Sequence, residues 1–207
     1  YEWRPPMANT AFIAPEICND YVSNLKDEHV FSSEFSYQFQ NSWLHANLNA
    51  YYSRLDHVTE WQCFYNDDEN SFTYVSMTGL KKEYYGVEAG LDFKLTSFLN
   101  FKAVGSISDA KNINNVNAYY MLSKSAELKS DKAYVKDMRE SGTPLTVGSL
   151  GLNFHSKGWF IDLNANYYDR IYLSYYPSYR YASTLQNRQN AAIKYPDIFE
   201  RVSEDGR

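Results

Sequence analysis

The sequence predicts an all-β fold, an antiparallel up-and-down transmembrane β-barrel segment of about six strands in three hairpins. Three observations predict it. Apolar and polar residues alternate with period two in successive runs. Short turns join the runs in pairs, whereas long polar segments separate the pairs. Aromatic residues lie near both ends of the runs, which is typical of strands that cross an outer membrane.

The alternation is clearest in the first hairpin, where Phe35 and Phe39 alternate with Glu34 and Gln38. The later runs repeat it. We expect one apolar face in each hairpin, because side chains two residues apart lie on the same side of a strand. These faces consist of Phe31, Phe35, Tyr37, Phe39, Leu44, Ala46, Leu48, Ala50 and Tyr52, then Tyr85, Val87, Ala89, Leu91, Phe93, Leu99, Phe101, Ala103 and Ile107, then Leu150, Leu152, Phe154, Ile161, Leu163, Ala165 and Tyr167.

The connections between runs differ in length. Short turns are expected at Asn41-Ser42, Thr96-Ser97 and Ser156–Gly158, and long polar loops at about 54–74 and 109–145. Outer-membrane barrels have short periplasmic turns and long extracellular loops. We therefore expect the short turns in the periplasm and the long segments outside the cell.

Aromatic residues support a membrane-spanning arrangement. Trp43 lies beside the first turn, and Tyr51 and Tyr52 lie at the far end of the same run. A tilted transmembrane strand needs about 9–11 residues, with aromatic belts at both interfaces. The alternative is a soluble β-sandwich, a carbohydrate-binding module whose aromatic residues stack on sugars. Period-two alternation alone fits both, and the aromatic belts and unequal connections favour the barrel.

Composition excludes other classes of protein. Lys and Arg number 20 against 25 Asp and Glu, a net charge of −5, so we expect no nucleic-acid partner. The sequence lacks the motifs of common hydrolases, nucleotide-binding proteins and metalloenzymes. Cys18 and Cys63 form no metal-binding pattern, and both a disulfide and two free thiols stay open. We predict no enzyme, no catalytic residue, no cofactor and no metal site.

Two segments resemble TonB-dependent outer-membrane receptors, particularly those of Bacteroidetes-type bacteria. The stretch SNLKDEHVFSSEFSYQF is similar to the family pattern "NP-x-Leu-Lys-Pro-Glu" followed by a strand beginning "Tyr-Glu-x-Gly". Asp27 stands where the family has Pro, and Ser36 where it has Gly. Gly86 and Glu88 fall at the recurring positions of a later strand pair. The matching positions of the first stretch are Asn24, Leu25, Lys26, Glu28 and Glu34.

The resemblance covers roughly residues 1–185 and implies a segment from the later part of a receptor barrel. Such receptors bind and import a metal chelate, glycan, cobalamin or peptide across the bacterial outer membrane. Implied partners are the rest of the barrel, an N-terminal plug domain, the TonB complex through that plug, outer-membrane lipid and a surface lipoprotein. A passive porin-type barrel segment is the remaining alternative.

The resemblance also suggests a division of the chain. We expect an extracellular entry segment at 1–28, barrel strands and loops at 29–181, and a polar loop or tail at 182–207, with the parent barrel continuing beyond it.

Ligand contacts are expected in the long loops. The segment at 54–74 combines aromatic rings, which stack on sugars or apolar chelates, with carboxylates that orient polar groups. The alternatives are that these rings extend the strands and pack on each other, and that the acidic cluster is a solvated tip rather than a calcium site. The candidates are Trp61, Tyr65, Asp67, Asp68, Glu69 and Phe72, with Tyr119 and Tyr120 from the Asn-rich segment as the second choice.

Overall fold

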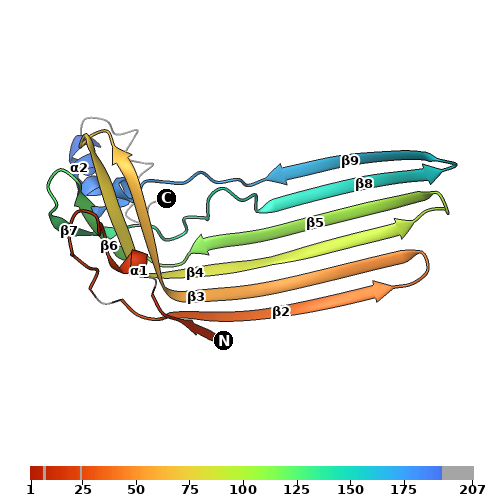
Figure 1. Cartoon of the computed structure of the whole chain (residues 1–207), viewed down its shortest axis with the longest axis horizontal. Coiled ribbons are helices and arrows are strands. Elements are labelled where there is room, and N and C mark those ends of the chain that lie inside the picture. The colour runs from red at the N-terminus through yellow and green to blue at the C-terminus, as the bar shows by residue number, and fades with distance from the viewer. Residues whose placement is uncertain (7, 24, 193–207) are drawn as a thin grey trace.

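The computed structural model describes residues 1–6, 8–23 and 25–192, which form one antiparallel sheet (Figure 1). The strand order is β1-β2-β3-β4-β5-β8-β9, and β6 pairs with β4 and β7. Asn24 of the family pattern and residues 193–207 of the expected tail lie outside the described residues. The strands are β1 (Glu2–Arg4), β2 (Glu28–Gln40), β3 (Leu44–Asn66), β4 (Ser71–Lys94), β5 (Leu99–Asn112), β6 (Val116–Leu122), β7 (Leu128–Ala133), β8 (Thr146–Ser156) and β9 (Trp159–Asp169); the helices are α1 (Ala8–Ala11), the 3₁₀ helix η1 (Pro177–Arg180) and α2 (Ala182–Ala192).

The three predicted hairpins are confirmed as β2–β3, β4–β5 and β8–β9. Their turns lie at one end of the sheet (Figure 1). The Asn41 side-chain oxygen accepts the backbone N–H groups of Trp43 and Leu44 at 2.9 and 2.7 Å. Lys157 and Gly158 both have positive φ, 49° and 85°, as a two-residue hairpin turn requires.

The strand register brings the predicted apolar positions together. Tyr37, Leu48 and Ala89 are register partners, and the row continues through Gly105, Gly148 and Tyr167. The adjacent row, on the opposite face, runs Gln38, Asn47, Gly90, Val104, Ser149 and Asn166. The sheet therefore has one apolar and one polar face. The described strands form a single sheet, so the two-sheet sandwich alternative is wrong.

The expectation of a loop at 54–74 is wrong, because β3 and β4 continue through it and turn only at 67–70. The segment at 109–145 likewise contains β6 and β7. We call residues 31–54, 83–107 and 146–169 the wall. We call the cap the β3–β4 extension (55–82) together with residues 8–23, 108–145 and 170–192. The cap lies at the end opposite the hairpin turns (Figure 1).

Two opposed β-bulges separate the wall from the extension. The register passes from Leu55↔Lys82 to Val58↔Leu80, and then to Glu60↔Met77. One extra residue in β3 is thus followed by one in β4. His57 has φ 63° and Gly79 has φ 77°, backbone values that suit such irregularities. Each bulge adds one residue to its strand and so reverses the faces on which the following side chains lie. The even-numbered residues of β3 therefore lie on one face of the sheet before the bulge and on the opposite face in the extension.

Buried side chains concentrate in the cap, on both faces of the extension. One hydrophobic cluster consists of Phe64, Val75, Met77, Leu80, Val116, Ala118, Ala133, Val135 and Tyr181. The other consists of Ile13, Ala14, Val22 and Met121. Because both faces are covered, the extension shows no simple alternation of apolar and polar residues, and a period of two does not reveal its strands.

Residues 182–192, expected within a polar loop or tail, instead form α2. Asp131 of β7 accepts the backbone N–H of Ser183 at 3.1 Å. It thereby satisfies one of the free N–H groups of the first helical turn. No helix within the described ranges is long and apolar enough to cross a membrane.

Candidate functional site

Residues 170–187, the chain that follows β9, cross one face of the β3–β4 extension and are called the strap. Tyr134 donates its backbone N–H to the Arg180 carbonyl at 2.9 Å, and Ala133 forms a bridge with Tyr181. In the middle of the strap, the Tyr176 ring stacks on Phe64, with centroids 4.4 Å apart. Two cavities lie on either side of this stacked pair.

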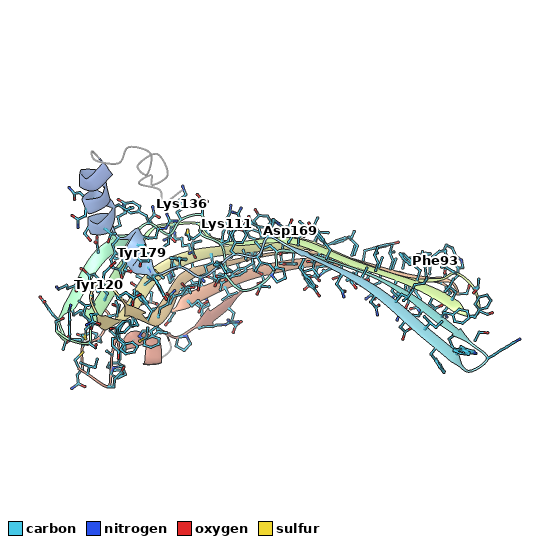
Figure 2. All side chains as sticks on the ribbon, turned by 90° about the horizontal axis from the view of Figure 1, so that it is seen from above. Phe93, Lys111, Tyr120, Lys136, Asp169 and Tyr179 are labelled. Atoms are coloured by element: carbon cyan, nitrogen blue, oxygen red, sulfur yellow. The ribbon has the colours of Figure 1, made fainter. Side chains whose placement is uncertain are left out.

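The tip cavity, about 370 Å³, lies between the end of the extension, β6 and the strap. In Figure 2, Tyr120 of β6 and Tyr179 of the strap lie together at the cap end, far from Phe93. The Tyr120 and Tyr181 rings stack with centroids 4.9 Å apart. Burial raises the pKa of Tyr181, so its hydroxyl keeps its proton. The polar lining includes Asn66, Asp68, Glu69, Thr73, Ser183 and Asn187.

The waist cavity, about 290 Å³, lies where the extension meets the wall. Lys82, only 5 % exposed, contacts the carboxylates of Glu60 and Glu140. Burial lowers the pKa of Lys82, but the two carboxylates outweigh burial and raise it above its ordinary value. Lys82 is therefore a buried ammonium ion held by two carboxylates. The hydroxyl of Tyr84 donates to Glu140 at 2.9 Å.

A second ion pair joins the coil before β8 to β5 at the waist. The Arg139 guanidinium donates to both oxygens of Asp109, at 2.8 and 3.3 Å, and lies over the Tyr172 ring. Burial raises the pKa of Asp109, but the Arg139 contact outweighs burial and the pKa falls below its ordinary value. Lys82 and Arg139 thus offset two of the three carboxylates at the waist, which leaves one net negative charge.

Both cavities contain buried polar atoms without hydrogen-bond partners. Within the described part of the chain, six buried side-chain atoms lack a partner. Four of them belong to cavity linings: Thr73 Oγ1 and the Tyr181 hydroxyl at the tip, and Asn112 Oδ1 and the Tyr175 hydroxyl at the waist. Buried polar groups normally have partners, so these four atoms offer hydrogen-bonding sites to a polar molecule in either cavity.

Comparison with known proteins identifies the family. A model of the family described as TonB dependent receptor-like, beta-barrel matches residues 3–199. The chain belongs to this family. No curated protein and no solved structure matches the chain significantly.

Membership in the TonB-dependent receptor barrels confirms the resemblance seen in the sequence. The family consists of outer-membrane receptors and transporters and is not an enzyme family. In a TonB-dependent receptor barrel, the apolar face of the wall meets lipid and the polar face meets the lumen. The match to receptors favours this class over the passive porin alternative.

The predicted ligand contacts separate onto different surfaces of this barrel segment. Asp68, Glu69 and Tyr120 line the tip cavity. Lys124 donates to the Glu69 carboxylate at 2.8 Å and lowers its pKa.

Two other candidates hold the N-terminal segment. The indole N–H of Trp61 donates to the Ile13 carbonyl at 2.8 Å, and the Tyr119 hydroxyl hydrogen-bonds that of Ser23 at 3.4 Å. These contacts join both rings to the N-terminal segment, and Trp61 also belongs to the lining of the waist cavity.

The remaining candidates are exposed at the end of the extension. Tyr65 and Phe72 contact each other edge to face, with centroids 5.3 Å apart. Asp67 lies in the turn and accepts the Asn70 N–H through its carbonyl at 3.3 Å. This geometry fits the interpretation that these rings extend the strands and pack on each other.

Sequence reasoning missed the strap and the waist. The relevant residues are Tyr175 and Tyr181 in the strap, and Lys82 with its two glutamates. The only local signal is the run YYPSYRY at 175–181, which is unusually rich in tyrosine. Lys82, Glu60 and Glu140 are far apart in sequence, and nothing local indicates that they meet.

Proposed function

We propose that this chain forms part of the wall and the extracellular cap of a TonB-dependent receptor that binds a glycan in the tip cavity and imports it. The observation that carries the proposal is the tip cavity itself. It combines two stacked tyrosines, two carboxylates and unpartnered buried hydroxyl groups in the cap of a receptor barrel.

The lining of the tip cavity suits a glycan better than the other nutrients of the family. Its polar groups are mostly amides and hydroxyls, which pair with sugar hydroxyls, and its rings offer apolar faces. Asp68 and Glu69 accept hydrogen bonds and orient such a ligand. Glu69 is already neutralised in part by Lys124, which reduces the attraction of the cavity for cations.

The same proposal assigns partners to the remaining surfaces. β1 and β9 are the two edges of the sheet, and further barrel strands must cover them because unpaired backbone groups are costly in lipid. A plug domain that reaches the TonB complex fills the polar face. A surface lipoprotein covers the cap. The cap lies outside the cell, and the hairpin turns lie in the periplasm.

Two neighbouring aspartates test the binding site. In the complete receptor, Asp68→Ala removes a carboxylate from the tip cavity and is expected to weaken glycan binding about tenfold. Asp67→Ala changes the adjacent residue, which does not line the cavity, and is the matched control. Equal effects of the two changes, measured by isothermal titration with soluble oligosaccharides, contradict the assignment.

Uptake tests the transport role. Cells that lack TonB are expected to lose import of the bound oligosaccharide while surface binding persists. Import that continues unchanged without TonB contradicts the proposed receptor mechanism and favours a passive pore.

A further inference from the structure

The two cavities lie in line along one face of the extension. Gln62 lines the waist cavity and Asn66 lines the tip cavity, and residues four apart in a strand share a face. The rise of a strand places these two positions about 13 Å apart. Phe64 lies midway between them, and the strap residue Tyr176 stacks on it. Strap residues therefore line both cavities, and the Phe64–Tyr176 contact lies between them.

Each cavity contains one strap tyrosine whose buried hydroxyl lacks a partner, Tyr175 at the waist and Tyr181 at the tip. Burying a hydroxyl without a hydrogen bond destabilises the folded state. The same unfavourable feature occurs twice within one short segment, each time beside open space. A ligand that occupies both spaces supplies both missing partners.

The charges at the waist define what fits there. Lys82 is held between Glu60 and Glu140, and Arg139 is paired with Asp109. Lys82 offsets only one of its two glutamates, so the waist keeps one net negative charge that disfavours anions, whereas Asn112 Oδ1 and the Tyr175 hydroxyl remain unpaired. The waist cavity is thus suited to a neutral molecule that donates and accepts hydrogen bonds.

We infer that the waist cavity is a second subsite of the same ligand path, and that one linear, hydroxyl-rich oligomer occupies both cavities at once. The inference rests on the proposed glycan binding at the tip. The oligomer crosses the divide over Tyr176, whose side chain stays 47 % exposed above Phe64. Chain length then determines affinity, because only a ligand longer than about 13 Å reaches both subsites.

Matched tyrosine-to-phenylalanine changes test the inference, because each removes only a hydroxyl that has no partner in the folded chain. The complete receptor is titrated with linear malto-, xylo- and cello-oligosaccharides, from disaccharides to long oligomers. Tyr175→Phe is expected to lower the affinity for long oligomers about tenfold and to leave the affinity for disaccharides unchanged. Tyr181→Phe is expected to lower the affinity for long oligomers and for disaccharides alike. Tyr172→Phe, a strap change outside both cavities, is the control.

The outcomes separate the two proposals. The second subsite is supported if the affinity of the unchanged receptor rises with oligosaccharide length and the affinity of the Tyr175→Phe variant does not. Affinity independent of length, or a rise that Tyr175→Phe leaves unchanged, overturns the second subsite while glycan binding at the tip stands. Binding of no saccharide of any length overturns the proposed glycan ligand. Receptor abundance in the outer membrane, measured for every variant, excludes loss of folding as the cause.

Discussion

Strands β9 in the wall and β6 in the cap belong to the same sheet but are stabilised by different surroundings. Every residue of β9 is exposed within this chain, including Leu163 and Tyr167. In β6, by contrast, Val116, Ala118 and Met121 are buried against other parts of the cap. The wall therefore depends on lipid and neighbouring strands, whereas the cap has a core of its own. Substitutions should follow different rules in the two regions.

The largest effect is expected from a charge on the apolar face of the wall. Leu91 shares a row with Ala46 and Ala103 on that face. Leu91→Arg is expected to destabilise the complete receptor by about 2–4 kcal/mol, because an arginine in the hydrocarbon layer is poorly solvated. Urea unfolding in lipid vesicles measures this free energy.

The control for this change lies on the polar face. The row of Leu91 continues through Ala103 and Leu150 to Ala165 in β9. Asn166 is the next residue along β9, so its side chain points to the opposite face of the sheet. Asn166→Arg is expected to cost under about 1 kcal/mol because its side chain meets a hydrated lumen. Equal costs for the two arginines contradict the assignment of the faces.

The cap is expected to respond instead to the loss of an internal ion pair. Lys82→Met leaves the Glu60 and Glu140 carboxylates without their shared cation. We expect a loss of about 2–3 kcal/mol, less than for a fully buried pair because both glutamates are partly exposed. Limited proteolysis of the cap in the intact receptor measures the change.

A surface ion pair provides the comparison for Lys82. Lys124 and Glu69 form a pair in which both side chains are about half exposed. Lys124→Met is expected to cost less than about 1 kcal/mol.

Adding Glu60→Gln to Lys82→Met should restore part of the lost stability, and an unchanged double variant contradicts the ion-pair explanation.

The sequence revealed the wall far better than the cap, and the reason is physical. In the wall one face meets lipid and the other meets water, so period-two alternation predicts strands, faces and turns. In the extension both faces are covered by protein, and the bulges at His57 and Gly79 shift the alternation. Apolar residues then occur at consecutive positions, as in 63–65, and no simple period remains.

The candidate site was predictable only where local composition indicated it. Acidic and aromatic residues near the end of the extension indicated Asp68 and Glu69, and the Asn-rich segment indicated Tyr120; all three line the tip cavity. The strap could not be predicted, because its placement depends on the contact between Phe64 and Tyr176, more than a hundred residues apart. Such a contact follows from tertiary packing and leaves no pattern in either segment.

Close packing across the wall gives a smaller expected effect. A Cβ added at Gly86 would lie 2.8 Å from Ser108 Cβ and 2.9 Å from the Ile107 carbonyl oxygen. Gly86→Ala is therefore expected to destabilise the receptor by about 1–2 kcal/mol through overpacking. At Gly105 the nearest atom would be 3.9 Å away, so Gly105→Ala should be nearly neutral. Thermal unfolding midpoints of the two variants test this difference, and similar shifts rule out steric crowding at Gly86.

The smallest expected effect distinguishes wall from cap by pH. The Arg139 contact holds the pKa of Asp109 below its ordinary value of about 3.9. A lowered pKa in the folded state stabilises the cap above the unfolded value, and this contribution is lost as pH falls through the folded value. We therefore expect the cap to lose about 1 kcal/mol as the pH falls below about 4, while the apolar rows of the wall are unaffected. Hydrogen exchange of β5 and the strap follows this change. Asp109→Asn should make the cap less stable near neutral pH and remove this part of the pH dependence; an unchanged profile in that variant assigns the acid sensitivity to another carboxylate.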